Sequence, residues 1–280
     1  MKKAIGIILV LATVIACCFA FAACNKETTG IEDGVLNVAT NCEFEPFEYL
    51  DESGNPTGID MDIAAALAKE LGLTCKIKDM AFDSVVGSVA SGAQDIAMAG
   101  LTVTNERKQS VDFTQTYFSS SQVVIAKNGS AILDVVAASD SEEDINSAIA
   151  SIEAALKGKK IGVQNGTTGY AYVSGDSDDY EGIGATAVGY ASGALAVQAL
   201  MNGTVDYVII DAVPASKLVA ANEGIKASTV VLTGEDYAFA VKKGNTELLN
   251  KINKAMDKLI ADGTIETIFS KYGLSSGLGE

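Results

Sequence analysis

AMAGLTVTNER, residues 97–107, decides the predicted fold. The apolar run from Ile96 to Leu101 predicts a buried strand. Thr102 and Thr104 follow and alternate with apolar residues, so their hydroxyls are expected on the same side. Ligands of open α/β sheets bind beyond the carboxyl ends of the strands. The stretch therefore predicts an α/β fold with a ligand site where this strand ends.

A single arginine completes the stretch. Asn105 is expected to cap a short helix that carries Arg107. The guanidinium group binds a carboxylate through two parallel hydrogen bonds, which lysine cannot do. Arg107 is therefore a candidate for binding an anionic group, and an exposed arginine in a loop is the alternative.

Four motifs in the same order resemble one protein family. Besides the Arg107 stretch, three segments match it: Val38–Asn41 leading into Phe44–Tyr49, Gly58–Ile63, and Gly162–Thr168. Together they resemble the family 3 solute-binding proteins of ABC importers, which bind polar amino acids. The match runs from about Leu36 to about Gly273. It implies the periplasmic-binding-protein type II fold, with two α/β lobes joined by a two-stranded hinge.

The resemblance also implies roles for particular residues. Arg107, with Thr102 and Thr168, would hold the α-carboxylate of a free amino acid, and Asp211, with the carbonyl of Gly100, its α-ammonium group. Two aromatic rings would enclose the ligand side chain. The full predicted ligand-binding set is Asn41, Phe44, Phe82, Gly100, Thr102, Arg107, Gln164, Thr168 and Asp211.

The residues themselves leave alternatives open at three of these positions. Phe44 and Phe82 each follow a predicted strand, where a phenylalanine also closes a core. Asp211 ends an apolar strand before a helix with Pro214 in its first turn, so it is also a candidate N-cap.

The side chain of the ligand is predicted from one position. Relatives that prefer basic ligands often have an acid where Asn41 stands, and the neutral Asn41 indicates a polar, uncharged side chain. Glu43 and Glu45 lie close by in sequence, and their charges leave a basic ligand open.

Composition excludes several classes of function. The 280-residue chain has a formal net charge of −16, which disfavours nucleic acid as a partner. It has no histidine and no cysteine cluster, so we expect no metal, no cofactor and no histidine-based triad. Cys42 and Cys75 are expected to stay unpaired, because neighbouring parallel strands would hold them too far apart for a disulfide.

The N-terminus reads as a lipoprotein export signal over residues 1–23. Lysines at positions 2 and 3 precede a long apolar run, which ends at Phe21-Ala22-Ala23-Cys24. This end resembles a lipobox with lipid on Cys24, and Cys17 is the alternative site. We therefore expect an extracytoplasmic protein anchored to the outer face of the cell membrane. An uncleaved membrane-spanning anchor is the other possibility.

The predicted domain boundaries follow from the order of the elements. Residues 24–34 would be a flexible tether. Residues 35–126 and 236–280 would form lobe 1, and residues 127–235 lobe 2, with an acidic and helical insertion at 130–156. Helices are expected at residues 60–71, 84–91, 192–201, 245–262 and 264–272.

The predicted function is that of a monomeric binding protein. It would capture an amino acid between its lobes and deliver it to an ABC permease. The alternative is an enzyme related to cyclohexadienyl or arogenate dehydratase, which has the same fold. Catalysis needs a positioned acid or base, and only Asp211 is a candidate in the sequence.

Overall fold

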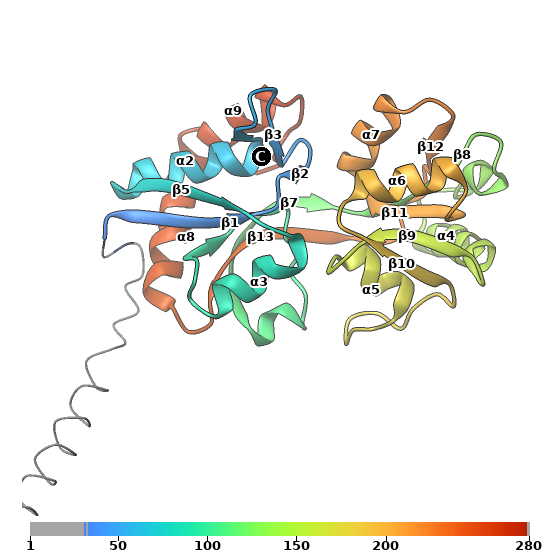
Figure 1. The fold of residues 1–280 in the computed structure, drawn as a ribbon, viewed down its shortest axis with the longest axis horizontal. Coiled ribbons are helices and arrows are strands. Elements are labelled where there is room, and N and C mark those ends of the chain that lie inside the picture. The colour runs from blue at the N-terminus through green and yellow to red at the C-terminus, as the bar shows by residue number, and fades with distance from the viewer. Residues whose placement is uncertain (1–30, 32, 279–280) are drawn as a thin grey trace, which may run out of the picture.

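The structure is a computed structural model that describes residue 31 and residues 33–278. The predicted signal segment 1–23, the lipid attachment site Cys24 and most of the predicted tether 24–34 lie outside the described residues. The described chain forms two α/β lobes side by side (Figure 1). This confirms the two-lobed α/β architecture expected from the sequence.

Lobe 1 is built around a five-stranded sheet in the order β5-β1-β6-β13-β7. Strands β5, β1 and β6 are parallel, and β13 runs antiparallel to both of its neighbours. The sheet strands are β1 (Val35–Thr40), β5 (Thr74–Asp79), β6 (Ile96–Ala97), β7 (Val111–Ser120) and β13 (Glu235–Lys242). The helices are α2 (Ile59–Leu71), α3 (Phe82–Ala90), η1 (Arg107–Gln109), α8 (Thr246–Ala261) and α9 (Thr264–Lys271). A small sheet adds β2 (Glu43–Phe44), β3 (Glu48–Leu50) and β4 (Pro56–Thr57).

Lobe 2 repeats this plan with the order β10-β9-β11-β8-β12. Its parallel strands are β10, β9 and β11, and β8 is antiparallel to β11 and β12. The strands are β8 (Gln122–Lys127), β9 (Lys160–Gln164), β10 (Thr186–Tyr190), β11 (Tyr207–Asp211) and β12 (Ile225–Ala227). The helices are η2 (Ala131–Asp134), α4 (Glu142–Leu156), α5 (Thr168–Ser174), α6 (Gly193–Asn202) and α7 (Ala212–Ala221).

Two chain crossings join the lobes. The first runs from β7 into β8, and the second returns into β13, which pairs with β7 (Figure 1). Because β8 belongs to the second sheet, the first crossing lies near Ser121 and not at the boundary of residues 126 and 127 that the sequence suggested. β8 follows β7 after a single residue, so no loop in the sequence marks the change from one lobe to the other.

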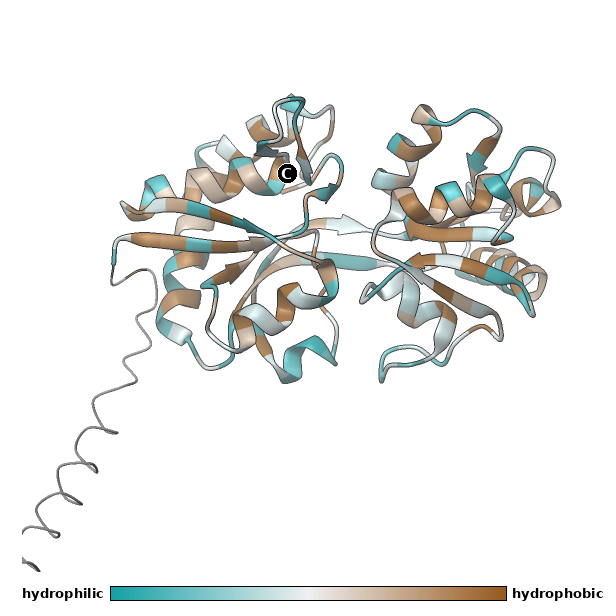
Figure 2. Cartoon of the chain, viewed as in Figure 1, coloured by the Kyte–Doolittle hydropathy of each residue, from teal (hydrophilic) through white to brown (hydrophobic). Residues whose placement is uncertain are grey.

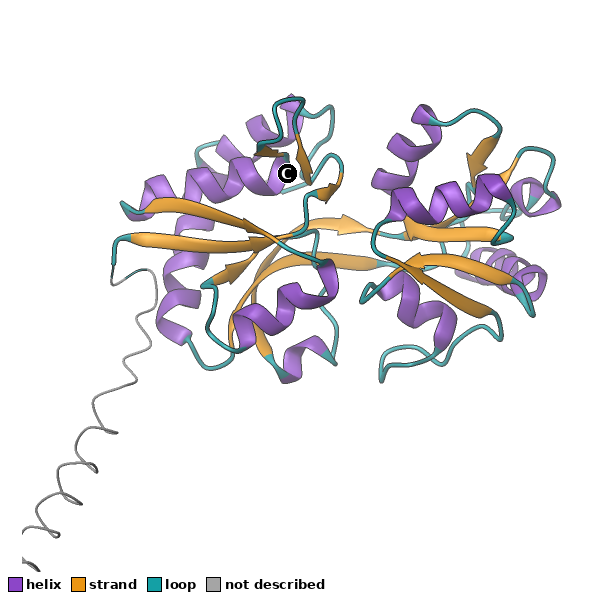
Figure 3. Cartoon of the chain, in the orientation of Figure 1, coloured by secondary structure: helices purple, strands orange, loops and turns teal. Residues whose placement is uncertain are grey.

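Each sheet is covered by helices on both faces (Figure 3). In β8, Val123 and Ile125 share a core with α6 and α7, whereas Val124 and Ala126 pack in a second core with α4 and α5. A strand buried on both faces is apolar throughout, and Figure 2 shows β11 largely in the colour of hydrophobic residues. The same alternation places α2 and α8 on one face of the first sheet and α3 on the other.

The predicted helices are confirmed, with ends that differ by one or two residues. Gly72 ends α2 in the left-handed conformation, as the sequence indicated. The predicted insertion contains α4, whose residues Ala148, Ile152 and Leu156 are buried in the lobe 2 core. Glu142 and Glu143 at its start are exposed, so the segment is a structural part of lobe 2 with one solvated face.

Cys42 and Cys75 are free thiols within the described residues. Cys75 pairs in register with Leu36, six residues before Cys42. Among residues 31 and 33–278, no helix combines the length and the apolar character needed to cross a membrane.

Candidate functional site

A small cavity lies between the lobes where four strands end. Strands β1 and β6 approach it from lobe 1, and β9 and β11 approach it from lobe 2. All nine residues of the predicted ligand-binding set line this cavity, and Thr167 is the one addition. The sequence motifs, which lie as far as 170 positions apart, thus meet at the edge where ligands of α/β sheets bind.

Arg107 connects the two lobes. Its Nη1 donates to the carbonyl oxygen of Thr102 at 2.7 Å, and its Nη2 to the carbonyl oxygen of Gly166 in lobe 2 at 3.0 Å. The guanidinium carbon lies 5.6 Å from the centre of the Phe82 ring. Burial lowers the pKa of Arg107, and the negative charge of Glu235 acts against this. The group remains a cation that faces the cleft.

The local structure that carries Arg107 differs from the prediction in two ways. Strand β6 has only two residues, because the chain turns at Gly100, where φ is 52°, before Thr102 pairs again with Tyr237 of β13. The short helix is a 3-10 turn, and the Thr104 hydroxyl, not Asn105, accepts a hydrogen bond from the Arg107 backbone N–H at 3.1 Å. The hydroxyl of Thr104 lies three residues before that N–H, which is the usual spacing of a cap.

Residue 100 must be a glycine, because its neighbours leave no room for a side chain. A Cβ at this position would lie 2.8 Å from the Phe44 ring, and its backbone has a positive φ. The Gly100 N–H donates to Asp60 at 3.0 Å, and the Tyr117 hydroxyl donates to the same carboxyl group at 2.7 Å. Burial raises the pKa of Asp60 to about 6, although these hydrogen bonds oppose the shift. Asp60 therefore positions the Gly100 loop.

Asp211 lies at the end of β11 and faces the cavity. Its carboxylate accepts hydrogen bonds from the hydroxyls of Ser120, at 3.2 Å, and Tyr237. Burial and the nearby charge of Glu235 raise the pKa of Asp211 to about 7. Asp211 occupies the N-cap position of α7, but its side chain bonds to the crossing strands instead of capping the helix. The Asp211 side chain therefore does not cap α7, which was the alternative that the sequence left open.

Asn41 and Gln164 form a pair of amides across the cleft. Gln164 Nε2 donates to Asn41 Oδ1 at 2.9 Å, and Asn41 Nδ2 donates to the carbonyl oxygen of Met80. Both side chains are buried. This end of the cavity is therefore polar and uncharged.

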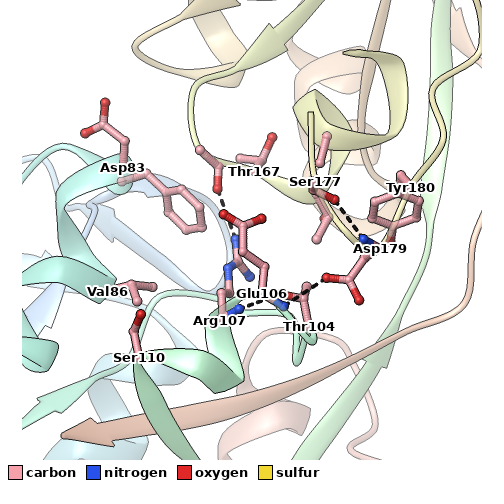
Figure 4. A pocket seen from close by; sticks show the side chains of 14 residues that line it. Asp83, Val86, Thr104, Glu106, Arg107, Ser110, Thr167, Ser177, Asp179 and Tyr180 are labelled. Carbon is pink, nitrogen blue, oxygen red and sulfur yellow. Dashed lines mark hydrogen bonds between the residues drawn. The ribbon is translucent and has the colours of Figure 1, made fainter. Parts of the chain in front are cut away.

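A second, larger hollow opens beside the cavity and shares with it Phe82, Arg107, Thr167 and Thr168 (Figure 4). Figure 4 shows Arg107 at its floor, with Asp179 and Tyr180 of lobe 2 opposite. Asp179 accepts hydrogen bonds from the backbone N–H groups of Asn105 and Glu106, at 3.0 and 3.1 Å. The loop that carries Asp179 thus closes over the start of η1.

Glu235 is a site residue that the sequence analysis missed. It is the first residue of β13, and 5% of its surface is exposed. The hydroxyls of Thr102 and Thr168, both in the predicted ligand-binding set, donate to its Oε2 at 2.7 and 3.0 Å. In the sequence, an acid before a strand looks like any exposed loop residue, so no local signal marks it.

The described residues contain no group of acidic and cysteine side chains that would hold a metal ion. Comparison with known proteins now identifies the family. The model of the bacterial extracellular solute-binding proteins, family 3, matches residues 36–275. The chain belongs to this family.

Individual relatives of this solute-binding protein agree with the match. The putative ABC transporter arginine-binding protein 2 of Escherichia coli K12 is 34% identical over 242 residues, which cover 85% of this chain and 90% of that protein. An ancestral arginine-binding protein bound to arginine has a TM-score of 0.72 at 38% identity, covering 85% of this chain and 98% of its own. The ancestral amino acid-binding protein AncCDT-1, a precursor of cyclohexadienyl dehydratase, has a TM-score of 0.72 at 29% identity, covering 89% and 99%. The structural neighbours share the two-lobed type II fold that the sequence predicted.

Proposed function

We propose that this solute-binding protein captures a free amino acid between its lobes and delivers it to an ABC permease. One observation carries the proposal: Arg107 of lobe 1 and Asp211 of lobe 2 line the same enclosed cavity. A cation and an acid on opposite walls match the α-carboxylate and α-ammonium groups that all free amino acids share. A ligand that touches both walls binds the closed form more tightly, and the permease would recognise that form.

The remaining predicted residues have supporting roles in this proposal. Phe44 and Phe82 would pack against the ligand side chain, and the carbonyl of Gly100 would accept from the ammonium group. The buried amides of Asn41 and Gln164 would bind a side chain with hydrogen-bond donors. An amide and a guanidinium both qualify, so glutamine and arginine are the first probes. Several similar proteins are named for arginine, which supports including the basic ligand.

The experiment is a thermal-shift screen of residues 25–280 against all free amino acids, followed by calorimetry of the hits. A ligand at a hundred times its dissociation constant stabilises the folded state by roughly 2.7 kcal/mol. We expect one or a few polar amino acids to raise the melting temperature. A panel without any shift, using protein refolded free of bound ligand, would contradict the proposal.

We propose that the protein has no enzymatic activity. A dehydratase acts through an acid at a reacting bond. Asp211, the one acid in the cavity lining, is instead assigned here to the ligand's ammonium group. Incubation with prephenate or arogenate should yield no aromatic product, and product formation that is lost in Asp211→Asn would overturn this assignment.

We also propose that the protein is a monomer tethered outside the cell membrane by lipid on Cys24. Small residues precede Cys24 at the point where apolar sequence gives way to polar sequence. Mass spectrometry of the membrane-bound protein should find a lipid-modified N-terminal cysteine at position 24. The variant Cys24→Ala should lack this modification, and lipid on Cys17 instead would refute the assignment.

A further inference from the structure

Glu235 is the most highly bonded carboxylate around the cleft. Its Oε2 accepts from Thr102 at 2.7 Å, Thr168 at 3.0 Å and Gln122 Nε2 at 3.4 Å. Its Oε1 accepts from Thr233 at 3.1 Å and lies 3.5 Å from the Tyr180 hydroxyl. A carboxylate has room for about four such donors, so these neighbours fill the capacity of Glu235. It has little left for direct contact with a ligand.

The donors to Glu235 come from both lobes. Thr102 follows β6 in lobe 1, whereas Thr168 opens α5 and Gln122 begins β8 in lobe 2. Glu235 itself lies at the second crossing, in register with Ser120 at the first. Its carboxylate therefore links the two lobes at the floor of the cleft.

The threonine protons limit what else can bind there. Each threonine hydroxyl has a single proton to donate, and in this structure both protons point to Glu235. The Thr168 oxygen in addition accepts from Gln122 Nε2 at 3.3 Å. A ligand carboxylate has no proton and needs donors, so it and Glu235 cannot receive the same hydroxyl protons at once.

Glu235 also replaces a ligand carboxylate electrostatically. Among the charged groups near Arg107, it acts most strongly on the guanidinium, ahead of Asp211. The positive charge that an incoming carboxylate would neutralise is thus already partly offset. A ligand carboxylate is expected to accept hydrogen bonds from Thr102 and Thr168 and to offset the charge of Arg107. In this structure Glu235 does both.

We propose that Glu235 is a built-in competitor of the ligand carboxylate: it holds the ligand-free lobes together through Thr102 and Thr168, and it must release their hydroxyl protons when an amino acid binds. The competition rests on the proposed amino-acid function, whereas the link between the lobes does not. Glu235→Gln replaces one accepting oxygen by an NH2 group, which donates to the hydroxyl oxygens when it faces Thr102 and Thr168. Both hydroxyl protons then become available to a ligand.

The first test needs no ligand. Small-angle X-ray scattering of the refolded, ligand-free protein is compared for wild type, Glu235→Gln and Asp236→Asn. Asp236 is the matched control, because it is the next residue, has the same charge and bonds to Ser119 instead of the threonines. We expect a larger radius of gyration for Glu235→Gln alone. Identical values for all three proteins would overturn the link between the lobes.

The second test measures affinity by calorimetry with arginine, glutamine and agmatine, which is arginine without its α-carboxylate. Whichever of the two amino acids wild type binds should bind Glu235→Gln about tenfold more tightly, as one released hydrogen bond to a charged group predicts. Agmatine should bind both proteins equally. Unchanged or weaker binding of the amino acid to Glu235→Gln would overturn the competition and leave Glu235 a purely structural residue.

The two tests remain informative if Glu235→Gln does not fold or if wild type binds no amino acid. If Glu235→Gln fails to give a cooperative thermal transition, Glu235→Asp takes its place, because the shorter side chain withdraws the carboxylate from the hydroxyls and should also raise affinity. If wild type binds no amino acid, the proposed function fails. The scattering comparison still decides whether Glu235 links the lobes.

Discussion

Nη2 of Arg107 donates a hydrogen bond to the carbonyl oxygen of Gly166, which lies 3.0 Å away in the opposite lobe. The approach is possible because residue 166 is glycine. A Cβ there would lie 2.9 Å from the Cα of Asp83 at the start of α3, and φ is 74°. The cleft can therefore close tightly enough to surround a small ligand.

Removing Arg107 should abolish most of the affinity. Arg107→Ala deletes the cation proposed to bind the α-carboxylate, and the loss of one partner of a buried charged pair costs about 2–5 kcal/mol. Calorimetry with the best ligand of the amino-acid panel should show a correspondingly weaker dissociation constant. Arg107→Lys keeps the charge without the planar pair of donors, and it should recover only part of the loss. An Arg107→Ala protein that binds normally would remove Arg107 from the site.

Ligand affinity should rise with pH up to neutrality. Asp211 has a pKa of about 7 in the ligand-free protein, and only its ionised form pairs with the α-ammonium group. Binding below pH 7 therefore requires the loss of a proton, so affinity at pH 6 should be about tenfold weaker than at pH 8. Calorimetry at several pH values measures this dependence.

The variant Asp211→Asn is the control for this pH effect, since it should bind weakly with a flatter profile. Asp60, with a pKa of about 6, titrates at lower pH and remains in both proteins. The stability of the ligand-free protein should change in the opposite direction. Because the pKa of Asp211 is raised on folding, its contribution to stability is present at pH 4 and is lost as the pH rises through about 7. A pH profile that Asp211→Asn does not alter would contradict the role of Asp211.

The preference of the site for one ligand side chain over another should change when Asn41 is replaced. In Asn41→Asp, the buried amide that pairs with Gln164 becomes a carboxylate that favours a cationic side chain. The ratio of arginine to glutamine affinity should rise by about tenfold or more, the worth of a charge-assisted hydrogen bond. Competition calorimetry with the two ligands gives this ratio. No change in the ratio would place the ligand side chain elsewhere in the cleft.

Opening of the cleft should depend on Asp179. Its carboxylate accepts from two backbone N–H groups of the other lobe, at 3.0 and 3.1 Å, so Asp179→Ala removes a contact made only when the lobes are closed. Ligand dissociation measured by stopped flow should accelerate about tenfold. Asp176→Ala removes the same charge from an exposed position in the same loop and should leave the rate unchanged. Equal rates in both variants would mean that the loop does not control release.

The fold could be predicted from the sequence because the patterns that mark its helices are local and recur along the chain. The apolar spacing in α2 and α8 predicted helices that the structure confirms, and Gly72 marked the end of α2 correctly. The errors arose where tertiary contacts override local preference. The run Ile96–Leu101 has the composition of a strand, but its regular pairing ends at Ala97, because the chain turns at Gly100, whose N–H donates to Asp60.

Only part of the candidate site could be predicted from the sequence. The residues that carry a family motif, such as Arg107 and Asp211, were predicted and line one cavity, although their roles await the experiments above. Glu235 was missed because its importance comes from four neighbours that are distant in sequence, among them Thr102, which is 133 residues away. Such a residue is recognised only when the whole chain is folded.

The pairing of β13 has a consequence for how the protein is made. Lobe 2 is a continuous piece of chain from β8 to β12, so it can complete its sheet while the ribosome is still adding the C-terminal residues. The first sheet is different, since β6 and β7 receive their shared neighbour only when residues 235–242 arrive. Until then β6 and β7 lack the strand that joins them, and the first sheet stays incomplete. The lobe that begins first in the sequence is thus the one that finishes its sheet last.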